Sequence, residues 1–321
     1  MQALQLMVHR RHFFRTRQSD GGEANRWYST SKMSLTFFGV MMSTPTISRR
    51  AFATLFFSVV LPVAALAAPI EDSYALPGPF ATTERTVLNG TKKMYRVYAP
   101  LGATLLMPIV TWGNGTGLGP KDYSGLMSHL ASYGMVVVDS YNGNTGDGKV
   151  ILDAALFLEK ENARPASPLF GKIDTARVAA VGHSQGAAGV INAATRYLRS
   201  SFITTVIPVG KSPSYLFKDD SSLLTAPIFY VGGTKDVITP PKLAQKSYEA
   251  TPAALPAALA VRVGAGHDEI RGNGGRERGY VTAWLMFQLF GDETAAAAFS
   301  GTHPEISSNS GWTSQETKNL P

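Results

Sequence analysis

The chain of 321 residues, 44% of them hydrophobic, can bury one sizeable core, and this composition excludes a largely disordered protein. It contains no cysteine, which excludes disulfides, thiolate metal sites and a cysteine nucleophile. Of the net charge of +7, most belongs to residues 1–67, which hold eight basic and two acidic side chains, so residues 68–321 give no electrostatic signal for nucleic acid.

The first 67 residues are typical of an export leader. Arg49 and Arg50 precede Phe52 and an apolar run, and Ala65-Leu66-Ala67 ends that run as an A-x-A cleavage site. The arginine pair predicts the twin-arginine route and a secreted or periplasmic protein, with an ordinary Sec signal as the alternative. The run is short for a membrane span and contains Pro62, so we expect no stable membrane anchor.

We expect the true start of the chain to be one of three later methionines rather than Met1. Residues 1–40 lack an apolar period, and Met33, Met41 and Met42 are all plausible first residues. We therefore exclude residues 1–67 from the fold and expect the mature protein to begin near Ala68 as a single catalytic domain over 68–321.

Apolar runs that favour strands alternate with helical patterns after the leader. We expect strands at 94–98, 107–112, 135–139, 177–182, 203–209, 227–231 and 259–263, and helices at 123–133, 150–161, 185–198, 242–250 and 278–290. This alternation predicts an α/β fold with a mostly parallel central sheet flanked by helices. The polar segment from Gly301 predicts an irregular strap over the surface.

The loop after the strand 107–112 is rich in glycine. It reads Gly113-Asn114-Gly115-Thr116-Gly117, and glycines let the backbone approach a substrate carbonyl closely. Phosphate binding is the other use of such a loop, but neither a GKS/T nor a G-x-G-x-x-G motif is present. We predict that the N–H of Thr116 is one donor of an oxyanion hole.

A nucleophile elbow is predicted at Ser184. The strand 177–182 runs into Gly182-His183-Ser184-Gln185-Gly186, a G-x-S-x-G motif at a strand-to-helix junction. Glycines on both sides remove Cβ atoms that would clash at so sharp a turn, and the N–H of Gln185 at the helix start becomes the second oxyanion donor. The plainer alternative is a glycine-rich turn whose serine caps the helix.

Two later strand ends supply partners for this serine. Asp236 follows the strand 227–231, and His267 follows the strand 259–263, at the carboxyl edge where open α/β sheets build their sites. The order Ser, Asp, His along the chain is the one that α/β-hydrolases use. We therefore predict Ser184, His267 and Asp236 as a catalytic triad that works without a metal or other cofactor.

The chain resembles the bacterial cutinase-like polyester hydrolases and their lipase and dienelactone-hydrolase relatives over most of residues 75–300. The similarity runs through 129–137 (HLASYGMVV), 172–178, the elbow and Ala283-Trp284-Leu285. It implies an α/β-hydrolase fold, ester hydrolysis, and the same triad and oxyanion pair.

The chain also departs from this family at informative positions. The family often has an aromatic residue where Thr116 stands, methionine where Gln185 stands, a tryptophan after the strand 203–209, and a disulfide near its end. Here the loop after 203–209 offers Tyr215 and Phe217, which we expect to form an apolar wall for the substrate, with His183 as a further wall residue.

The sequence thus predicts a secreted, monomeric serine carboxylic ester hydrolase with an ester substrate, polymeric in the polyester interpretation. A small-molecule or lipid esterase is the alternative, and a non-catalytic binding protein on a hydrolase scaffold is a more remote one. Only Gly210 to Ala226 separates the strands 203–209 and 227–231, so we predict no large lid over the site.

Overall fold

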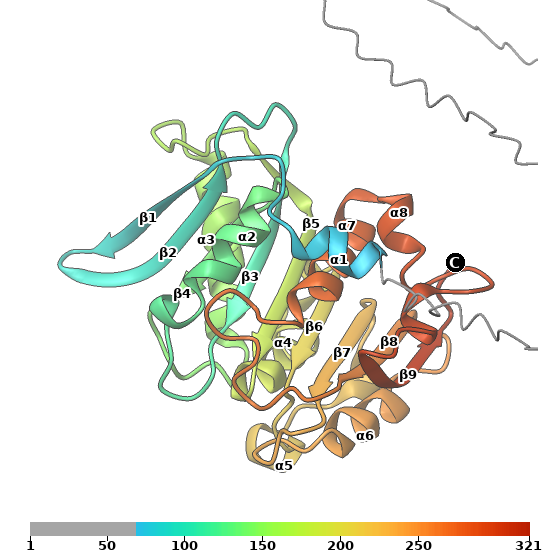
Figure 1. Cartoon of the computed structure of the whole chain (residues 1–321). Helices are drawn as coiled ribbons and strands as arrows, with labels where there is room; N and C mark the ends of the chain where they lie inside the picture. Colours follow the sequence, from blue (N-terminus) through green and yellow to red (C-terminus); the bar gives the residue numbers. More distant parts are fainter. Residues whose placement is uncertain (1–68) are drawn as a thin grey trace, which may run out of the picture. The chain divides into compact units, whose positions relative to one another are not determined.

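A nine-stranded sheet forms the centre of the computed structural model, which describes residues 69–321 (Figure 1). The predicted export leader lies outside the described residues. In chain order the elements are α1 (Pro69–Ala75), β1 (Thr82–Asn89), β2 (Lys92–Pro100), β3 (Met107–Gly113), α2 (Ser124–Ser132), β4 (Val136–Ser140), α3 (Lys149–Ala163), β5 (Ile173–His183), α4 (Gln185–Thr195), β6 (Thr205–Val209), α5 (Ser214–Phe217), β7 (Ile228–Gly233), α6 (Lys242–Ala250), β8 (Ala257–Arg262), α7 (Arg278–Phe290), α8 (Glu293–Ala296) and β9 (Trp312–Lys318).

The strand order is β1-β2-β4-β3-β5-β6-β7-β8-β9. The six strands from β4 to β8 in this order run parallel to one another, while β1, β2 and β9 pair antiparallel at the two edges. Parallel strands carry their carboxyl ends to one edge of the sheet, so the loops after β3, β5, β7 and β8 open on the same side.

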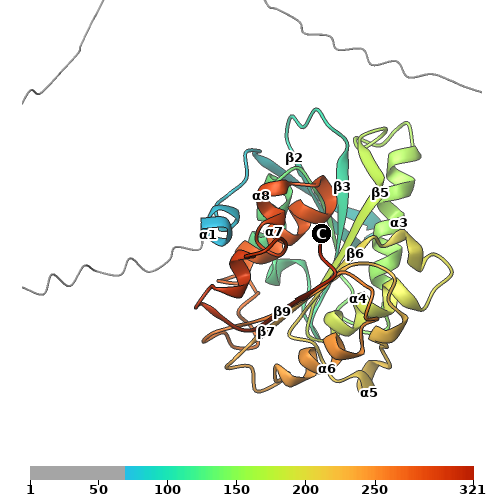
Figure 2. The same cartoon turned by 90° about the vertical axis from the view of Figure 1, so that its right-hand side faces the viewer.

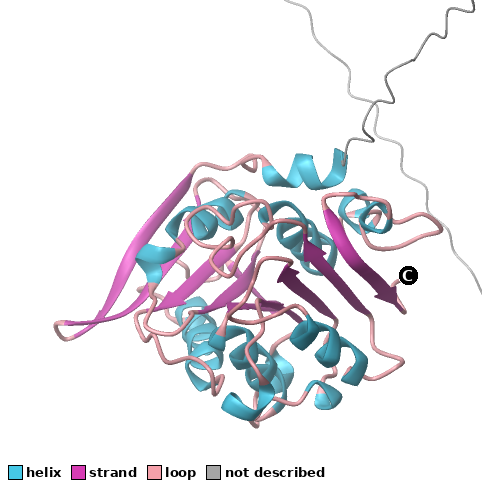
Figure 3. Ribbon diagram, turned by 60° about the horizontal axis from the view of Figure 1, so that its bottom comes forward, coloured by secondary structure: helices cyan, strands magenta, loops and turns pink. Residues whose placement is uncertain are grey.

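Helices cover both faces of the sheet, as the alternating pattern predicts (Figures 2 and 3). One apolar core joins the sheet to α2 and α7, through residues such as Leu130 and Trp284. The other joins it to α3, α4 and α6, through residues such as Leu158 and Val190. Alternate residues of β5 enter the two cores, since successive side chains of a strand point to opposite faces. The predicted mostly parallel α/β architecture is confirmed.

The prediction for the segment after Gly301 is wrong in part. This segment contains β9, which pairs antiparallel with β8 at the edge of the sheet, and its pairing shifts register between Leu259 and Val261. Its sequence after Trp312 is polar because an edge strand has one free side and exposes much of its length to solvent. The sequence patterns missed β1 for the same reason, and α1 because it is only seven residues long.

Contacts between the two ends of the described chain hold α1 in place. A carboxylate of Glu305 accepts hydrogen bonds from the N–H groups of Ile70 and Glu71, at the start of α1. The buried carboxylate of Glu71 in turn accepts from Trp312 Nε1 at 2.9 Å and from Arg262.

Among residues 69–321, no helix is long and apolar enough to cross a membrane.

Candidate active site

Ser184 stands on a strained turn between β5 and α4. Its φ is +59° and its ψ is −120°, a backbone conformation that residues other than glycine rarely adopt. The turn is possible because both flanking positions of the motif are glycine. A Cβ on Gly182 would collide with the carbonyl of Gly186, and a Cβ on Gly186 would collide with the carbonyl of Gly113 in β3. The two glycines therefore leave the room that this turn needs at the strand end.

His267 lies between the hydroxyl of Ser184 and the carboxylate of Asp236. Its Nε2 is 3.0 Å from Ser184 Oγ, and its Nδ1 is 2.8 Å from Asp236 Oδ2. Asp236 can only accept when ionised, so Nδ1 carries the proton and Nε2 is free to accept from the serine hydroxyl. The three side chains come from the ends of β5, β7 and β8, and the structure brings together residues that are 31 and 52 positions apart in the chain.

The environment of Asp236 favours its ionised form. Burial by itself would raise the pKa of this carboxyl, but hydrogen bonds from His267 and Thr239 outweigh that effect and lower the pKa below its ordinary value. Thr239 donates to it twice, from its backbone N–H at 2.7 Å and from its hydroxyl at 2.6 Å, and Ile238 adds a third donor. A carboxylate held in this way keeps the imidazole oriented and can stabilise a positive charge on it.

The two predicted oxyanion donors flank Ser184. Thr116 is exposed and lies in the loop after β3, while Gln185 is the first residue of α4, where backbone N–H groups have no partner within the helix. The side-chain amide of Gln185 is engaged elsewhere, because it donates to the carbonyl of Gly143. Only its backbone N–H is therefore offered to a substrate, at the positive end of the helix dipole.

A fully buried amide–carboxyl pair supports the loop that carries Thr116. Asn114 Nδ2 donates to Asp139 Oδ1 at 2.8 Å and to the backbone carbonyl of Ser140, while the backbone carbonyl of Asn114 accepts from the hydroxyl of Thr145. Burial raises the pKa of Asp139 well above its ordinary value, which favours the neutral acid. The loop is thus held to the end of β4 by groups that water does not reach.

An open cleft of about 300 Å³ surrounds Ser184. Nine residues line it, namely Gly115, Thr116, Leu118, His183, Ser184, Ile238, His267, Asp268 and Arg271. The sequence reasoning missed Leu118, Ile238, Asp268 and Arg271. Ile238 is 64% exposed although it is apolar, and its position two residues after Asp236 on the same loop was a signal that could have identified it.

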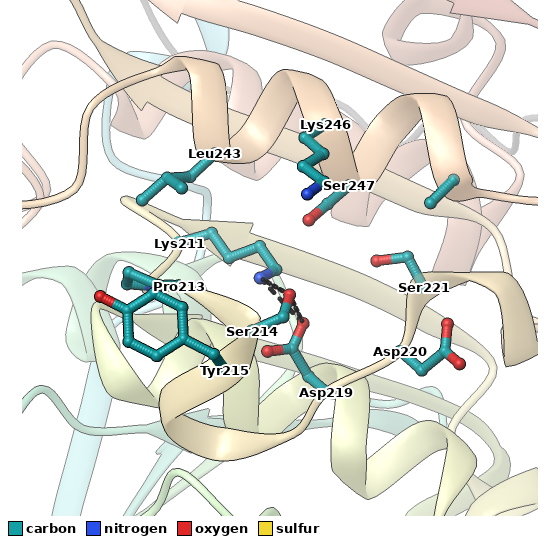
Figure 4. A pocket seen from close by; sticks show the side chains of 11 residues that line it. Lys211, Pro213, Ser214, Tyr215, Asp219, Asp220, Ser221, Leu243, Lys246 and Ser247 are labelled. Atoms are coloured by element: carbon teal, nitrogen blue, oxygen red, sulfur yellow. Dashed lines mark hydrogen bonds and ion pairs between the residues drawn. The ribbon is translucent and has the colours of Figure 1, made fainter.

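The predicted wall residues Tyr215 and Phe217 do not line this cleft. Both belong to the short helix α5, which turns Tyr215 into a separate pocket beside α6 (Figure 4). The ring of Phe217 instead packs close to Gly146. The prediction that they form a wall beside Ser184 is therefore wrong.

A buried ion pair explains the placement of α5. Lys211 Nζ lies 2.8 Å from Asp219 Oδ2, with both side chains almost completely buried, and it also donates to the hydroxyl of Ser214. This ion pair joins the two ends of the segment 211–219, which contains α5 (Figure 4). A buried lysine that pairs with an acid eight residues later leaves no trace in hydrophobic periodicity, which is why the sequence did not reveal it.

His183 does line the cleft, but its side chain is only 1% exposed and both ring nitrogens are engaged. Nε2 is 2.8 Å from the backbone carbonyl of His267, and Nδ1 is 3.0 Å from the hydroxyl of Tyr123. Burial, together with the nearby His267, lowers the pKa of His183 to about 4.

Residues 69–321 contain no cluster of three or more His, Asp or Glu side chains that could hold a metal ion.

Comparison with known proteins agrees with this geometry. The model of a family described as PET hydrolase-like matches residues 67–318, which is most of the chain and includes every residue of the cleft. No curated protein matches the chain.

Proposed function

Since the chain belongs to the PET hydrolase-like family, we propose that it is a serine hydrolase of carboxylic esters, with Ser184 as nucleophile and polyester chains among its substrates. The observation that carries the proposal is the position of His267, within 3.0 Å of Ser184 Oγ and 2.8 Å of Asp236. A serine on a strained turn with a histidine and an ionised aspartate in line is the arrangement that acyl transfer requires.

The reaction would proceed in two halves. His267 Nε2 accepts the proton of Ser184, whose Oγ attacks the ester carbonyl and forms a tetrahedral intermediate. The N–H groups of Thr116 and Gln185 stabilise the oxyanion, each by about 3–4 kcal/mol. His267 then protonates the departing alcohol, and water repeats the sequence on the acyl-enzyme to release the acid. Asp236 holds the tautomer of His267 throughout.

The shape of the site supports long substrates. The β6–β7 connection contains only α5 and one short helical turn at 221–223, which leaves little chain for a lid over the cleft. The apolar lining consists of Leu118 and Ile238, without a phenyl, phenol or indole ring. Aliphatic walls bury apolar acyl units but do not add the ring stacking that aromatic walls would offer to an aromatic unit. They also suit the alternative function of a small-ester or lipid esterase.

One panel of substrates separates these functions. We expect turnover of a soluble p-nitrophenyl ester, release of soluble products from an aliphatic polyester film, and slower release from an aromatic polyester film. With a short triglyceride, the rate should saturate smoothly through the solubility limit, because the short β6–β7 connection leaves no segment long enough to open as a lid at an interface. Ester turnover without release from either film would support the small-ester function. A sharp rise in rate at the solubility limit would contradict the open site.

We further propose that the protein is exported and that its leader is removed after Ala67. The proposal rests on the arginine pair Arg49-Arg50, the apolar run and the A-x-A site. N-terminal sequencing of protein recovered outside the cytoplasm should read Ala68-Pro69-Ile70. Active protein that retains the leader would contradict export, and lysine at both arginine positions should block it if the twin-arginine route is used.

A further inference from the structure

A chain of buried hydrogen bonds connects the loop of Thr116 with the backbone of His267. It begins at the N–H of Gly115, which is 3.1 Å from Tyr123 Oη. Tyr123 Oη is 3.0 Å from His183 Nδ1, and His183 Nε2 is 2.8 Å from the carbonyl oxygen of His267. Neither Tyr123 nor His183 is exposed by more than 1%, so water does not compete for these bonds.

The direction of every bond in this chain is determined by its two ends. The carbonyl of His267 can only accept, so His183 carries its proton on Nε2 and its Nδ1 accepts. Tyr123 must then donate to Nδ1, which leaves its oxygen free to accept from the N–H of Gly115. The low pKa of His183, about 4, agrees with a neutral ring that has one donor and one acceptor.

These hydrogen bonds join the loop of Thr116, the turn of Ser184 and the loop of His267, whose relative positions matter for acyl transfer. Gly115 immediately precedes Thr116, and among the described residues no hydrogen bond of the backbone occupies the N–H of Thr116. His183 immediately precedes Ser184, and the carbonyl at the other end belongs to His267 itself. The oxyanion donor, the nucleophile and the base lie on three different strand ends, so nothing in the sheet alone sets the positions of the two loops relative to the serine.

We propose that Tyr123 and His183 are positioning residues that set the oxyanion loop and His267 at their working distance. The proposal rests on the function proposed above and assigns His183 a role other than contact with substrate. Close packing supports the proposal. A Cβ on Gly115 would lie 3.1 Å from both His183 Nδ1 and Tyr123 Oη, so the loop has no room to shift toward these two side chains.

The substitution Tyr123→Phe tests the proposal with little disturbance of the core. It removes one hydroxyl and keeps the ring, which packs against Trp112 with centroids 4.8 Å apart. The N–H of Gly115 and Nδ1 of His183 lose their partner, and the loop can move. Because a displacement of about 1 Å near reacting atoms can cost about a hundredfold, we expect kcat to fall about ten- to hundredfold with KM little changed.

Tyr230→Phe is the matched control. Tyr230 is also a fully buried tyrosine whose hydroxyl is hydrogen bonded, to Thr251 Oγ1 at 2.9 Å, but it packs with α6 and does not line the cleft. The Tyr230→Phe protein should lose about as much stability as Tyr123→Phe and keep the wild-type kcat. Active sites are counted by titration with a phosphonate ester, so that kcat refers to folded, reactive enzyme in each variant.

A double variant tests whether the two residues act as one unit. If they form a single chain, Tyr123→Phe combined with His183→Gln should lower kcat no further than the more damaging single substitution. Losses that multiply would mean that the two residues act independently and would overturn the proposal.

Hydrogen exchange gives a readout that does not depend on catalysis. In Tyr123→Phe, peptides covering 113–119 and 263–268 should both exchange faster, whereas Tyr230→Phe should leave them unchanged. Unchanged exchange with wild-type kcat per site in Tyr123→Phe, or equal loss of kcat in both variants, would overturn the proposal. If wild type neither turns over esters nor reacts with the phosphonate, the proposed function fails, while the exchange data still decide whether this hydrogen-bond chain holds the two loops.

Discussion

Ser184→Ala is expected to lower kcat on a soluble ester by about 10⁴-fold or more while the protein stays folded. The substitution removes the hydroxyl that His267 Nε2 contacts at 3.0 Å. Alanine keeps the Cβ, so the strain of the φ of +59° is the same in both proteins. The remaining rate would come from binding and the oxyanion donors alone.

The measurements are kcat, the thermal unfolding midpoint and the mass of the protein after treatment with a phosphonate ester. Wild type should gain one adduct on Ser184, and Ser184→Ala should gain none. Ser222→Ala, at an exposed serine whose hydroxyl donates to Asp220, serves as the control and should match wild type in all three measurements. A folded Ser184→Ala protein with near-normal kcat, or an adduct on a different serine, would contradict the assignment.

Gly186→Ala should prevent folding rather than only reduce activity. The added Cβ would overlap the carbonyl of Gly113, and the next nearest atom is the carbonyl oxygen of Asn114. Both are backbone atoms, and Gly113 ends β3 in the middle of the sheet, so neither can move as a side chain could. Overpacking by side chains typically costs about 1–3 kcal/mol, and a backbone collision should cost about 4 kcal/mol or more, a large part of the stability of a domain.

The expected result for Gly186→Ala is a sharp fall in soluble yield and, in any soluble fraction, a lower unfolding midpoint in urea. Gly119→Ala is the matched control, because its φ of −163° is ordinary extended backbone and no atom lies within 4 Å of the added Cβ. Its free energy of unfolding should stay within about 0.5 kcal/mol of wild type. A stable, soluble Gly186→Ala protein would show that the elbow can adopt another backbone path.

The main features of the fold could be predicted from the sequence because they depend on local patterns. Buried parallel strands read as continuous apolar runs, and amphipathic helices repeat at 3.6 residues, so that the bounds of α6 and α7 match their predictions to the residue. Other bounds were displaced: α4 ends at Thr195 instead of Leu198, and β6 begins at Thr205. Element ends depend on capping and packing, which periodicity does not report.

In the candidate site, too, local patterns predicted some residues correctly and failed for others. The positions of Ser184, Asp236 and His267 relative to the sheet followed from a local motif and from two strand ends, because parallel strands must bring their carboxyl ends to one edge. Tyr215 and Phe217 were placed wrongly, because the segment that holds α5 packs through tertiary contacts, such as the buried ion pair of Lys211 with Asp219, which no local pattern reveals.

By itself, then, the sequence determined the parallel strands of the sheet, the elbow and the three side chains at its carboxyl edge, since backbone sterics and hydrophobic periodicity act between residues close in the chain. Only the tertiary structure decided the lining of the cleft, the edge strand β9 and the link from Gly115 through Tyr123 and His183 to His267. These features depend on contacts such as those of Tyr123 with His183, 60 positions apart, and of His183 with His267, 84 positions apart. Such contacts exist only after the core has brought their elements together.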